Sequence, residues 1–342
     1  MIVILIIILV ISGFGLIKTE THDTCLNKEY TDAIKGLFII IVFYSHIIPY
    51  LTTAGVSFSP ILDIPSNRFI QKTGQLMVVM FLFYSGYGVM ESIQKKGELY
   101  IRSMPLKRIL STLANYAIAV TVFFIMNTII GIHYSIKEYI LSLIAWESVG
   151  QSNWYIFAII CCYLSSYLSF SVFKQKNYAL ASTVLLLLVY YIILHSLKNS
   201  WWYNTILAYP AGMLVSLNKK DVFCILERHY PLCFSGLLLL FILLFLYRNA
   251  TPIYLTMSVI FAFLMFSATY KFVIKNKFLT WCGKNLFQIY VYQRIPMILL
   301  LNMFPDMTKM HPYIYVSCCF AITLLFAYFI KPISFNYSKS SR

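Results

Sequence analysis

Residues 33–51 read Ala33-Ile-Lys-Gly-Leu-Phe-Ile-Ile-Ile-Val-Phe-Tyr-Ser-His-Ile-Ile-Pro-Tyr-Leu51, a mostly apolar stretch. A helix of about 20 such residues spans the hydrocarbon core of a bilayer, so this stretch predicts a membrane-spanning helix. Similar stretches recur along the chain, and together they predict an all-α polytopic transmembrane bundle with ten core helices and one extra N-terminal helix. The predicted spans are residues 1–17, 33–51, 76–92, 109–131, 153–173, 178–195, 201–217, 232–247, 252–270, 285–303 and 312–330.

The composition of the 342 residues supports this interpretation. Hydrophobic residues make up 60% of the chain and charged residues only 11%, whereas a soluble domain carries about 25% charged residues. The aromatic content of 17% excludes a disordered chain, which lacks the side chains that build a core. The net charge of +15 comes from cations in short connections between apolar runs. We therefore expect contact with anionic membrane lipid and no nucleic-acid partner.

The distribution of the cations also predicts the orientation. If residues 18–32 and every second connection after them are cytoplasmic, 20 of the 27 lysines and arginines lie inside, as the positive-inside rule requires. The C-terminus is then inside and the N-terminus outside. Residues 1–17 lack the positive charge that precedes the core of a signal peptide, although a cleaved or mis-started segment is the alternative. We divide the chain into an N-terminal helix with a short inner segment (1–26), a membrane domain (27–331) and a cytoplasmic tail (332–342).

Polar residues in the second predicted span indicate a functional site, because polar side chains are costly inside a bilayer. Asp32, Lys35 and His46 lie on one helical stripe, and Asp32 and Lys35 are close enough in sequence to pair. His46 lies about 16 Å of helix beyond Lys35, past the midplane toward the outside. A neutral imidazole there is suited to general-base work or to carrying an acyl group. Bonded to a neighbouring carbonyl, it would serve structure alone.

A buried cation is expected at a similar depth in the tenth predicted span. Arg294 lies about 13 Å beyond the inner surface, and an arginine there should face the bundle and be paired. A polar cavity shared with His46 is therefore expected. We predict that His46 and Arg294 are catalytic, with Arg294 stabilising an oxyanion together with Gln293 or Tyr290.

Three further groups of residues are candidates for binding. Tyr84 and Ser85 precede Gly86 and Gly88, small residues that admit either a neighbouring helix or a flat ligand. The inner connection at about 92–108 has a cluster of cations suited to the phosphates of a nucleotide-like donor, although topology alone also places cations there. These are Arg102, Lys107 and Arg108. An outer connection contributes residues suited to a sugar, or to anchoring at the membrane edge, namely Glu147, Asn153 and Trp154. The eight cysteines form no metal or disulfide framework.

Five motifs together resemble the integral-membrane acyltransferase 3 family, in the family's order over about residues 27–330. They are Asp32-Ala-Ile-Lys-Gly-Leu…Tyr-Ser-His46, Phe81-Leu-Phe-Tyr-Ser-Gly-Tyr87, Asn153-Trp-Tyr155, Tyr209-Pro-Ala-Gly-Met-Leu214 and Gly283-Lys-Asn-Leu…Ile-Tyr290. The sequence departs from the pattern at two places. Ser111 stands where the family often has the second arginine of Arg-x-x-Arg, and Gln293 with Arg294 follows the late tyrosine where many members have a histidine.

The resemblance implies transfer of an acyl group, often acetyl, from cytosolic acyl-CoA to a hydroxyl of a cell-surface polysaccharide or lipid-linked glycan. It implies that His46 is the family's essential histidine and that Arg102 and Arg108 match its donor-binding arginines. Acyl-CoA would then be a co-substrate, with no permanently bound cofactor and no metal, in a multi-pass protein of the bacterial plasma membrane. A glycan transporter or flippase, or a polysaccharide polymerase, is the alternative. Against transport, no repeated halves are apparent.

Overall fold

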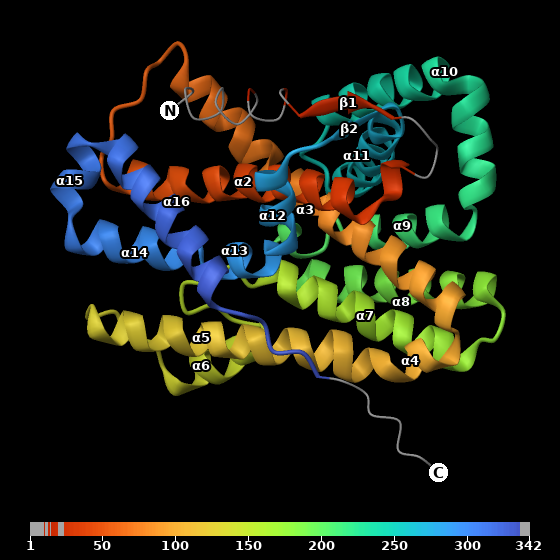
Figure 1. The fold of residues 1–342 in the computed structure, drawn as a ribbon. Coiled ribbons are helices and arrows are strands. Elements are labelled where there is room, and N and C mark those ends of the chain that lie inside the picture. Colours follow the sequence, from red (N-terminus) through yellow and green to blue (C-terminus); the bar gives the residue numbers. More distant parts are fainter. Residues whose placement is uncertain (1–9, 11–12, 14, 20–23, 336–342) are drawn as a thin grey trace.

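The computed structural model describes residues 10, 13, 15–19 and 24–335, and most of this length is helical (Figure 1). The all-α fold predicted from the sequence is confirmed. Besides the α-helices there are three other short helical elements and two short strands, β1 and β2. Elements η1 and η3 are 3₁₀ turns, and η2 is π-helical. In chain order the elements are β1 (Leu16–Lys18), η1 (Thr24–Leu26), α2 (Lys28–Thr53), α3 (Asp63–Lys96), α4 (Glu98–Met104), η2 (Pro105–Leu110), α5 (Ser111–Ile129), α6 (Ile136–Leu143), α7 (Trp154–Val172), α8 (Lys176–Leu197), η3 (Ser200–Trp202), α9 (Ala208–Leu217), α10 (Lys219–Leu246), α11 (Thr251–Lys271), β2 (Phe272–Ile274), α12 (Lys277–Lys284), α13 (Leu286–Tyr292), α14 (Arg294–Met303), α15 (Pro305–Met310) and α16 (Pro312–Phe329).

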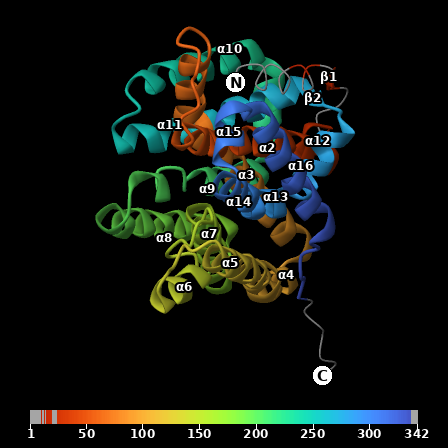
Figure 2. The same ribbon diagram turned by 90° about the vertical axis from the view of Figure 1, so that its left-hand side faces the viewer.

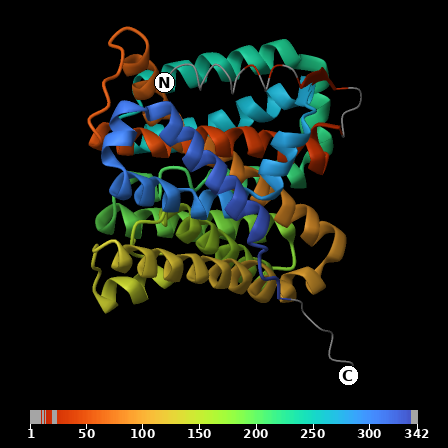
Figure 3. The ribbon, with the colours of Figure 1, turned by 60° about the vertical axis from the view of Figure 1, so that its left-hand side comes forward.

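Within the described residues, eight helices are long and apolar enough to cross a membrane. They are α2, α3, the continuous rod from α4 to α5, α7, α8, α10, α11 and α16. Figures 1 and 3 show most of them side by side with roughly parallel axes, and Figure 2 shows the bundle from its end. In the most apolar 18-residue window of α3, 67% of the residues are buried inside the protein, whereas in that of α10 none is buried. Helix α3 is therefore central, and α10 presents its leucines outward.

Two predicted spans are not continuous helices. Only the second half of 201–217 forms a regular helix, α9, after the short turn η3. The span 285–303 is divided at Gln293 into α13 and α14. Pro296 has no N–H to donate to the carbonyl of Tyr292, four residues earlier, which explains a break at this point. The break places polar residues at the junction of two short helices deep in the bundle.

The predicted inner connection at 92–108 is helical, and the prediction of a loop there was wrong. Helix α3 continues to Lys96, Gly97 reverses the chain with a φ of 54°, and α4 begins at Glu98. The rod then continues through the π-helical segment η2 into α5. Because side chains on a helix point in different directions, the cations of this segment do not form one cluster.

The N-terminal segment differs from the prediction where it is described. Leu16–Lys18 form strand β1, which pairs antiparallel with β2 after α11. The end of the predicted span 1–17 is therefore a strand. Residues 1–9, 11–12 and 14, where the rest of that span was predicted, lie outside the described residues.

Two close helix crossings fix the centre of the bundle. At the crossing of α3 and α9, a Cβ atom on Gly86 would overlap the carbonyl oxygen of Tyr209, and one on Gly212 would overlap that of Phe83. Helices α2 and α12 make a similar contact through Gly36 and Gly283. The absence of side chains lets the backbones touch. The close helix approach that the sequence allowed at Gly86 is confirmed.

Candidate functional site

His46 lies in a small pocket of about 120 Å³ between α2, α3 and α13, which we call the histidine pocket. Its lining residues are Val42, Ser45, His46, Gly74, Gln75, Val78, Trp154, Trp201 and Tyr290. Nδ1 of His46 is buried and has no hydrogen-bond partner among the described residues. The imidazole is therefore not held through Nδ1 by a neighbouring carbonyl, and it retains capacity for a ligand.

Helices α13 and α14 place Tyr290 and Arg294 along α2. The rings of His46 and Tyr290 have centroids 6.2 Å apart, and one turn further along, the Arg294 guanidinium lies 5.9 Å from the ring centroid of Tyr50. His46 and Arg294 thus occupy successive turns of one interface.

Arg294 is held by a backbone group rather than by a carboxylate. Its Nη1 donates to the carbonyl of Gly150 at 3.3 Å, while its Nε is buried without a partner in the described part of the chain. Gln293 is fully buried, and its Nε2 donates to the carbonyl of Tyr290 at 2.9 Å. Arg294 therefore braces the loop before α7 and keeps one donor free. Neither Arg294 nor Gln293 lines the histidine pocket, so the expected cavity shared by His46 and Arg294 is not found among the described residues, because Arg294 lies one turn further along α2.

A larger cavity of about 700 Å³, which we call the cationic cavity, opens at the beginning of α2 and the end of α3. Its lining residues are Leu26, Asn27, Lys28, Thr31, Lys35, Tyr84, Ser85, Tyr87, Gly88, Glu91, Ser92, Lys95, Arg108 and Lys219. Five of these side chains are basic and one is acidic. The predicted residues Lys35, Tyr84, Ser85 and Arg108 thus meet in one place. A cavity with this charge is suited to a ligand with several negative charges.

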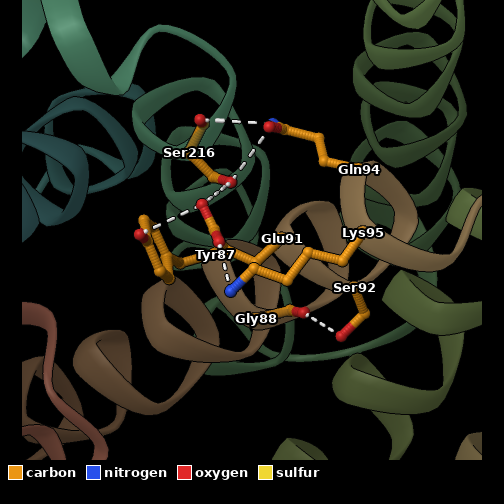
Figure 4. Close-up of polar contacts among 7 residues, drawn as sticks. All are labelled: Tyr87, Gly88, Glu91, Ser92, Gln94, Lys95 and Ser216. Atoms are coloured by element: carbon orange, nitrogen blue, oxygen red, sulfur yellow. Dashed lines mark hydrogen bonds and ion pairs between the residues drawn. The ribbon is translucent and has the colours of Figure 1, made fainter.

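Each of two lysines in this cavity is paired with a carboxylate. Lys35 Nζ lies 2.6 Å from Oδ1 of the buried Asp32, which confirms the pairing expected from their spacing. Lys95 Nζ lies 3.2 Å from Glu91 Oε2. The hydroxyls of Tyr87 and Ser216 donate to Oε1 of the same carboxylate at 3.2 and 3.1 Å (Figure 4). Glu91 is therefore held in place by three neighbours, and it holds Lys95 at the cavity wall.

Arg108 has a different environment, because its neighbours are tyrosines. Its Nε donates to the hydroxyl of Tyr100 at 3.0 Å, and its guanidinium lies 5.8 Å from the ring centroid of Tyr163. In the described part of the chain no carboxylate pairs with it. It projects from the π-helical segment η2, a type of distortion that is frequent at functional sites. Arg108 is thus positioned for an anion that the described residues do not supply.

The other two predicted donor-binding cations lie elsewhere. Arg102 pairs with Glu98, with Nη2 2.6 Å from Oε1, and lines a separate cavity. Lys107 lines neither cavity. The helical course of this segment separates the three cations, so the single cluster predicted from the sequence is wrong.

Tyrosines connect the cationic cavity to the histidine pocket. Lys35 and Ser85 line the cavity, and His46 and Gly74 line the pocket, so the same two antiparallel helices contribute to both. The hydroxyl of Tyr155 interacts with Ser85. Its ring centroid lies 5.2 Å from that of Tyr290, which lines the histidine pocket. Tyr155 therefore contacts a lining residue of each cavity.

The predicted sugar-binding residues have different positions. Trp154 lines the histidine pocket. The amide of Asn153 donates to the carbonyls of Ala145 and Glu147 at 3.2 and 2.9 Å. Glu147 lies 3.2 Å from Lys198 Nζ. Asn153 and Glu147 thus stabilise the loop before α7, while only Trp154 faces the pocket.

Several lining residues were missed in the sequence analysis. Ser45 and Gln75 line the histidine pocket, and Gln75 Nε2 donates to the carbonyl of Trp201 at 2.9 Å. Gln75 directly precedes the predicted span 76–92, so the sequence places it in the connection between two predicted spans and not in a helix. In the cationic cavity, Glu91 and Lys95 were missed. A carboxylate at position 91, inside a predicted span, was the signal that could have revealed them.

Comparison with known proteins identifies the family. The profile of the acyltransferase 3 family, described as an acyltransferase domain, matches residues 28–331. The searches of curated proteins and of solved structures returned no match to this chain. The matched residues include the histidine pocket, the cationic cavity except Leu26 and Asn27, and all the long helices that the structure describes. The chain is a multi-pass membrane protein, and it belongs to the acyltransferase 3 family.

Proposed function

We propose that the protein is a membrane O-acyltransferase of the bacterial plasma membrane. It takes an acyl group, acetyl in the simplest case, from cytosolic acyl-CoA and transfers it to a hydroxyl of a polysaccharide or lipid-linked glycan. The observation that carries the proposal is the placement of a cationic cavity and a histidine pocket at two depths of the same helix pair, with tyrosines between them.

The cationic cavity would bind the donor. Coenzyme A carries a pyrophosphate and a ribose phosphate, and arginine binds such groups through paired hydrogen bonds. Arg108 has no acidic partner among the described residues. It would make the main contact with the phosphates, in the cavity that Ser85 also lines. The pairs Asp32–Lys35 and Glu91–Lys95 hold two further ammonium groups at the wall. The thioester arm would then extend past Ser85 toward Tyr155.

The histidine pocket would perform the transfer. His46 removes the proton of the acceptor hydroxyl, whose oxygen attacks the thioester carbonyl carbon. The carbon–sulfur bond breaks, and the proton held by the imidazole passes to the leaving thiolate. In the alternative route His46 first accepts the acyl group, and the acceptor then removes it. Tyr290 in the pocket, and Arg294 one turn of α2 beyond it, would stabilise the negative charge on the carbonyl oxygen. Trp154 and Trp201 would offer flat faces to a sugar ring.

Replacement of the cavity arginine tests the donor assignment. Arg108→Gln is expected to raise KM for acyl-CoA about tenfold to hundredfold, because a hydrogen bond to a charged group is lost. Steady-state kinetics in membranes at varied acyl-CoA measure this. The matched control is Arg102→Gln, which removes the same group from a different cavity and should leave KM within about twofold. An equal rise in both variants would contradict the assignment of the donor to the cationic cavity.

Arg294→Ala is expected to leave a folded protein with kcat lowered about 10²–10³-fold, the usual cost of losing an oxyanion donor. Arg294→Lys should recover part of this loss because the charge returns. Asn127→Ala is the control, since the Asn127 amide also braces the loop before α7, donating to the carbonyl of Val149 at 2.6 Å. If Asn127→Ala lowers kcat as much as Arg294→Ala, bracing of the loop explains both and the oxyanion role is wrong.

The composition of the surface glycan tests the overall function. Deletion of the gene should remove a fixed acyl mass from each modified sugar, and mass spectrometry of the glycan measures this. A change in the amount or length of the glycan, with acylation intact, would instead support the transporter or the polymerase.

A further inference from the structure

A cavity of about 510 Å³, distinct from the two described above, lies between α4 and the junction of α7 with α8. We call it the lateral pocket. Helix α3 contributes Ile93 to it, whereas Glu91, Ser92 and Lys95 of the same helix line the cationic cavity. At 100° per residue Ile93 lies on a different face of α3 from these three residues. The lateral pocket is therefore separate from the proposed donor site.

Three basic side chains from two distant segments surround the lateral pocket. They are Arg102 of α4 and, at the start of α8, Lys174 and Lys176. Glu98 is the acidic lining residue, and it pairs with Arg102. No ion pair involves Lys174 or Lys176 in the part of the chain that the structure describes. The lining residues of the pocket therefore carry a net positive charge, three basic side chains against one acidic one.

The backbone adds donors at the same place. Gln175, the residue before the first turn of α8, makes no capping hydrogen bond with its side chain. The first N–H groups of a helix have no partner within the helix, and they attract anions when they lie beside cations. Lys176 is the first residue of this 22-residue helix, so its own N–H is among these donors. The lateral pocket thus combines ammonium, guanidinium and amide donors.

The remaining walls are apolar and continue onto the outer surface of the bundle. Tyr167, Phe170 and Phe173 line the pocket. Beside them Val172 and Leu99 are 72% and 55% exposed. In a membrane-spanning bundle such side chains face acyl chains. A ligand that fits must be anionic at one end and apolar at the other, which describes a phospholipid and not a soluble nucleotide.

We propose that the lateral pocket binds an anionic phospholipid, with the phosphate of its headgroup between Arg102 and the two lysines and its acyl chains against Phe173 and Val172. By the distribution of cations, the lipid comes from the cytoplasmic leaflet. The headgroup shares its phosphate chemistry with free phosphate esters, and the apolar wall selects the lipid.

Retention of lipid by the purified protein tests this proposal. The full chain is exchanged into nanodiscs of phosphatidylcholine with increasing phosphatidylglycerol, and bound phosphatidylglycerol is measured by native mass spectrometry. The double variant Lys174→Gln/Lys176→Gln is expected to weaken binding about 30-fold, because each basic residue near an anionic surface contributes about fivefold. The matched control is Lys275→Gln/Lys277→Gln, which removes two exposed lysines of the same spacing that line neither cavity. It should bind like the unmodified chain.

Two further measurements identify the ligand. Glycerol 3-phosphate should not displace phosphatidylglycerol at equal concentration, and the double variant should bind coenzyme A, measured by calorimetry, as tightly as the unmodified chain. Equal lipid loss in the control pair would overturn the proposal, since charge anywhere on this face would then suffice. Displacement by glycerol 3-phosphate would assign the pocket to free phosphate esters, and weakened coenzyme A binding would assign it to the donor. Either result overturns the lipid assignment.

Discussion

His46→Ala is expected to lower acyl transfer by about 10²–10⁴-fold, the contribution of a positioned general base. The structure adds a reason, because the imidazole lines a pocket and its Nδ1 makes no hydrogen bond to any described residue. His46→Gln keeps a polar side chain of similar size, and it should be as inactive if proton transfer is required. Transfer of labelled acyl groups from acyl-CoA to the glycan in isolated membranes measures the effect.

A histidine outside the pocket is the control for this experiment. His133 is exposed in the connection between α5 and α6, and His133→Ala should retain full activity. The amount of each variant in the membrane is compared by immunoblot, so that loss of protein is not mistaken for loss of catalysis. Substantial activity in His46→Gln would disprove the role of the imidazole in proton transfer and in covalent transfer alike.

The largest effect on stability is expected for Gly86→Ala. Its new methyl group would overlap the carbonyl oxygen of Tyr209, a backbone atom of α9 that cannot turn aside. Overpacking a core costs about 1–3 kcal/mol, and we expect about 3 kcal/mol here because two backbones must separate. The variant should show a clearly lower Tm in detergent by scanning fluorimetry.

Gly88→Ala is the matched control, two residues further along the same helix. No atom lies within 4 Å of a Cβ atom built at Gly88. Alanine is favoured over glycine in a helix by up to about 1 kcal/mol, so the Tm should hold or rise. Similar destabilisation by both variants would mean that the contact between α3 and α9 does not hold the bundle together.

The long helices could be predicted from the sequence because the hydropathy of a run directly measures the free energy of transferring its side chains from water into the bilayer. Residues 33–51 and 252–270 are examples, and both lie within single helices, α2 and α11. The division of 285–303 could not be predicted in the same way, since Pro296 leaves the hydropathy of the run unchanged. What it removes is one backbone hydrogen bond, and that loss determines where Gln293 and Arg294 lie.

The candidate site could be predicted only where sequence neighbours are also neighbours in space. The pair Asp32–Lys35 follows from helical spacing alone. The separation of Arg102 from Arg108 depends on the helical course of 98–110, which a charged sequence next to a proline does not reveal. Lys219 joins the cationic cavity because α9 crosses α3 at glycines more than a hundred residues apart, a contact without any local signal.

The glycine crossings have a consequence for how turnover proceeds. Lys35 and Ser85 line the cationic cavity. Each directly precedes a glycine at a helix crossing, Gly36 or Gly86. Backbones in direct contact slide or tilt only by breaking that contact, so the core cannot rock between inward-open and outward-open shapes as a carrier does. On the function proposed above, the small acyl group would then pass through a core of fixed shape, while donor and acceptor stay on their own sides of the membrane.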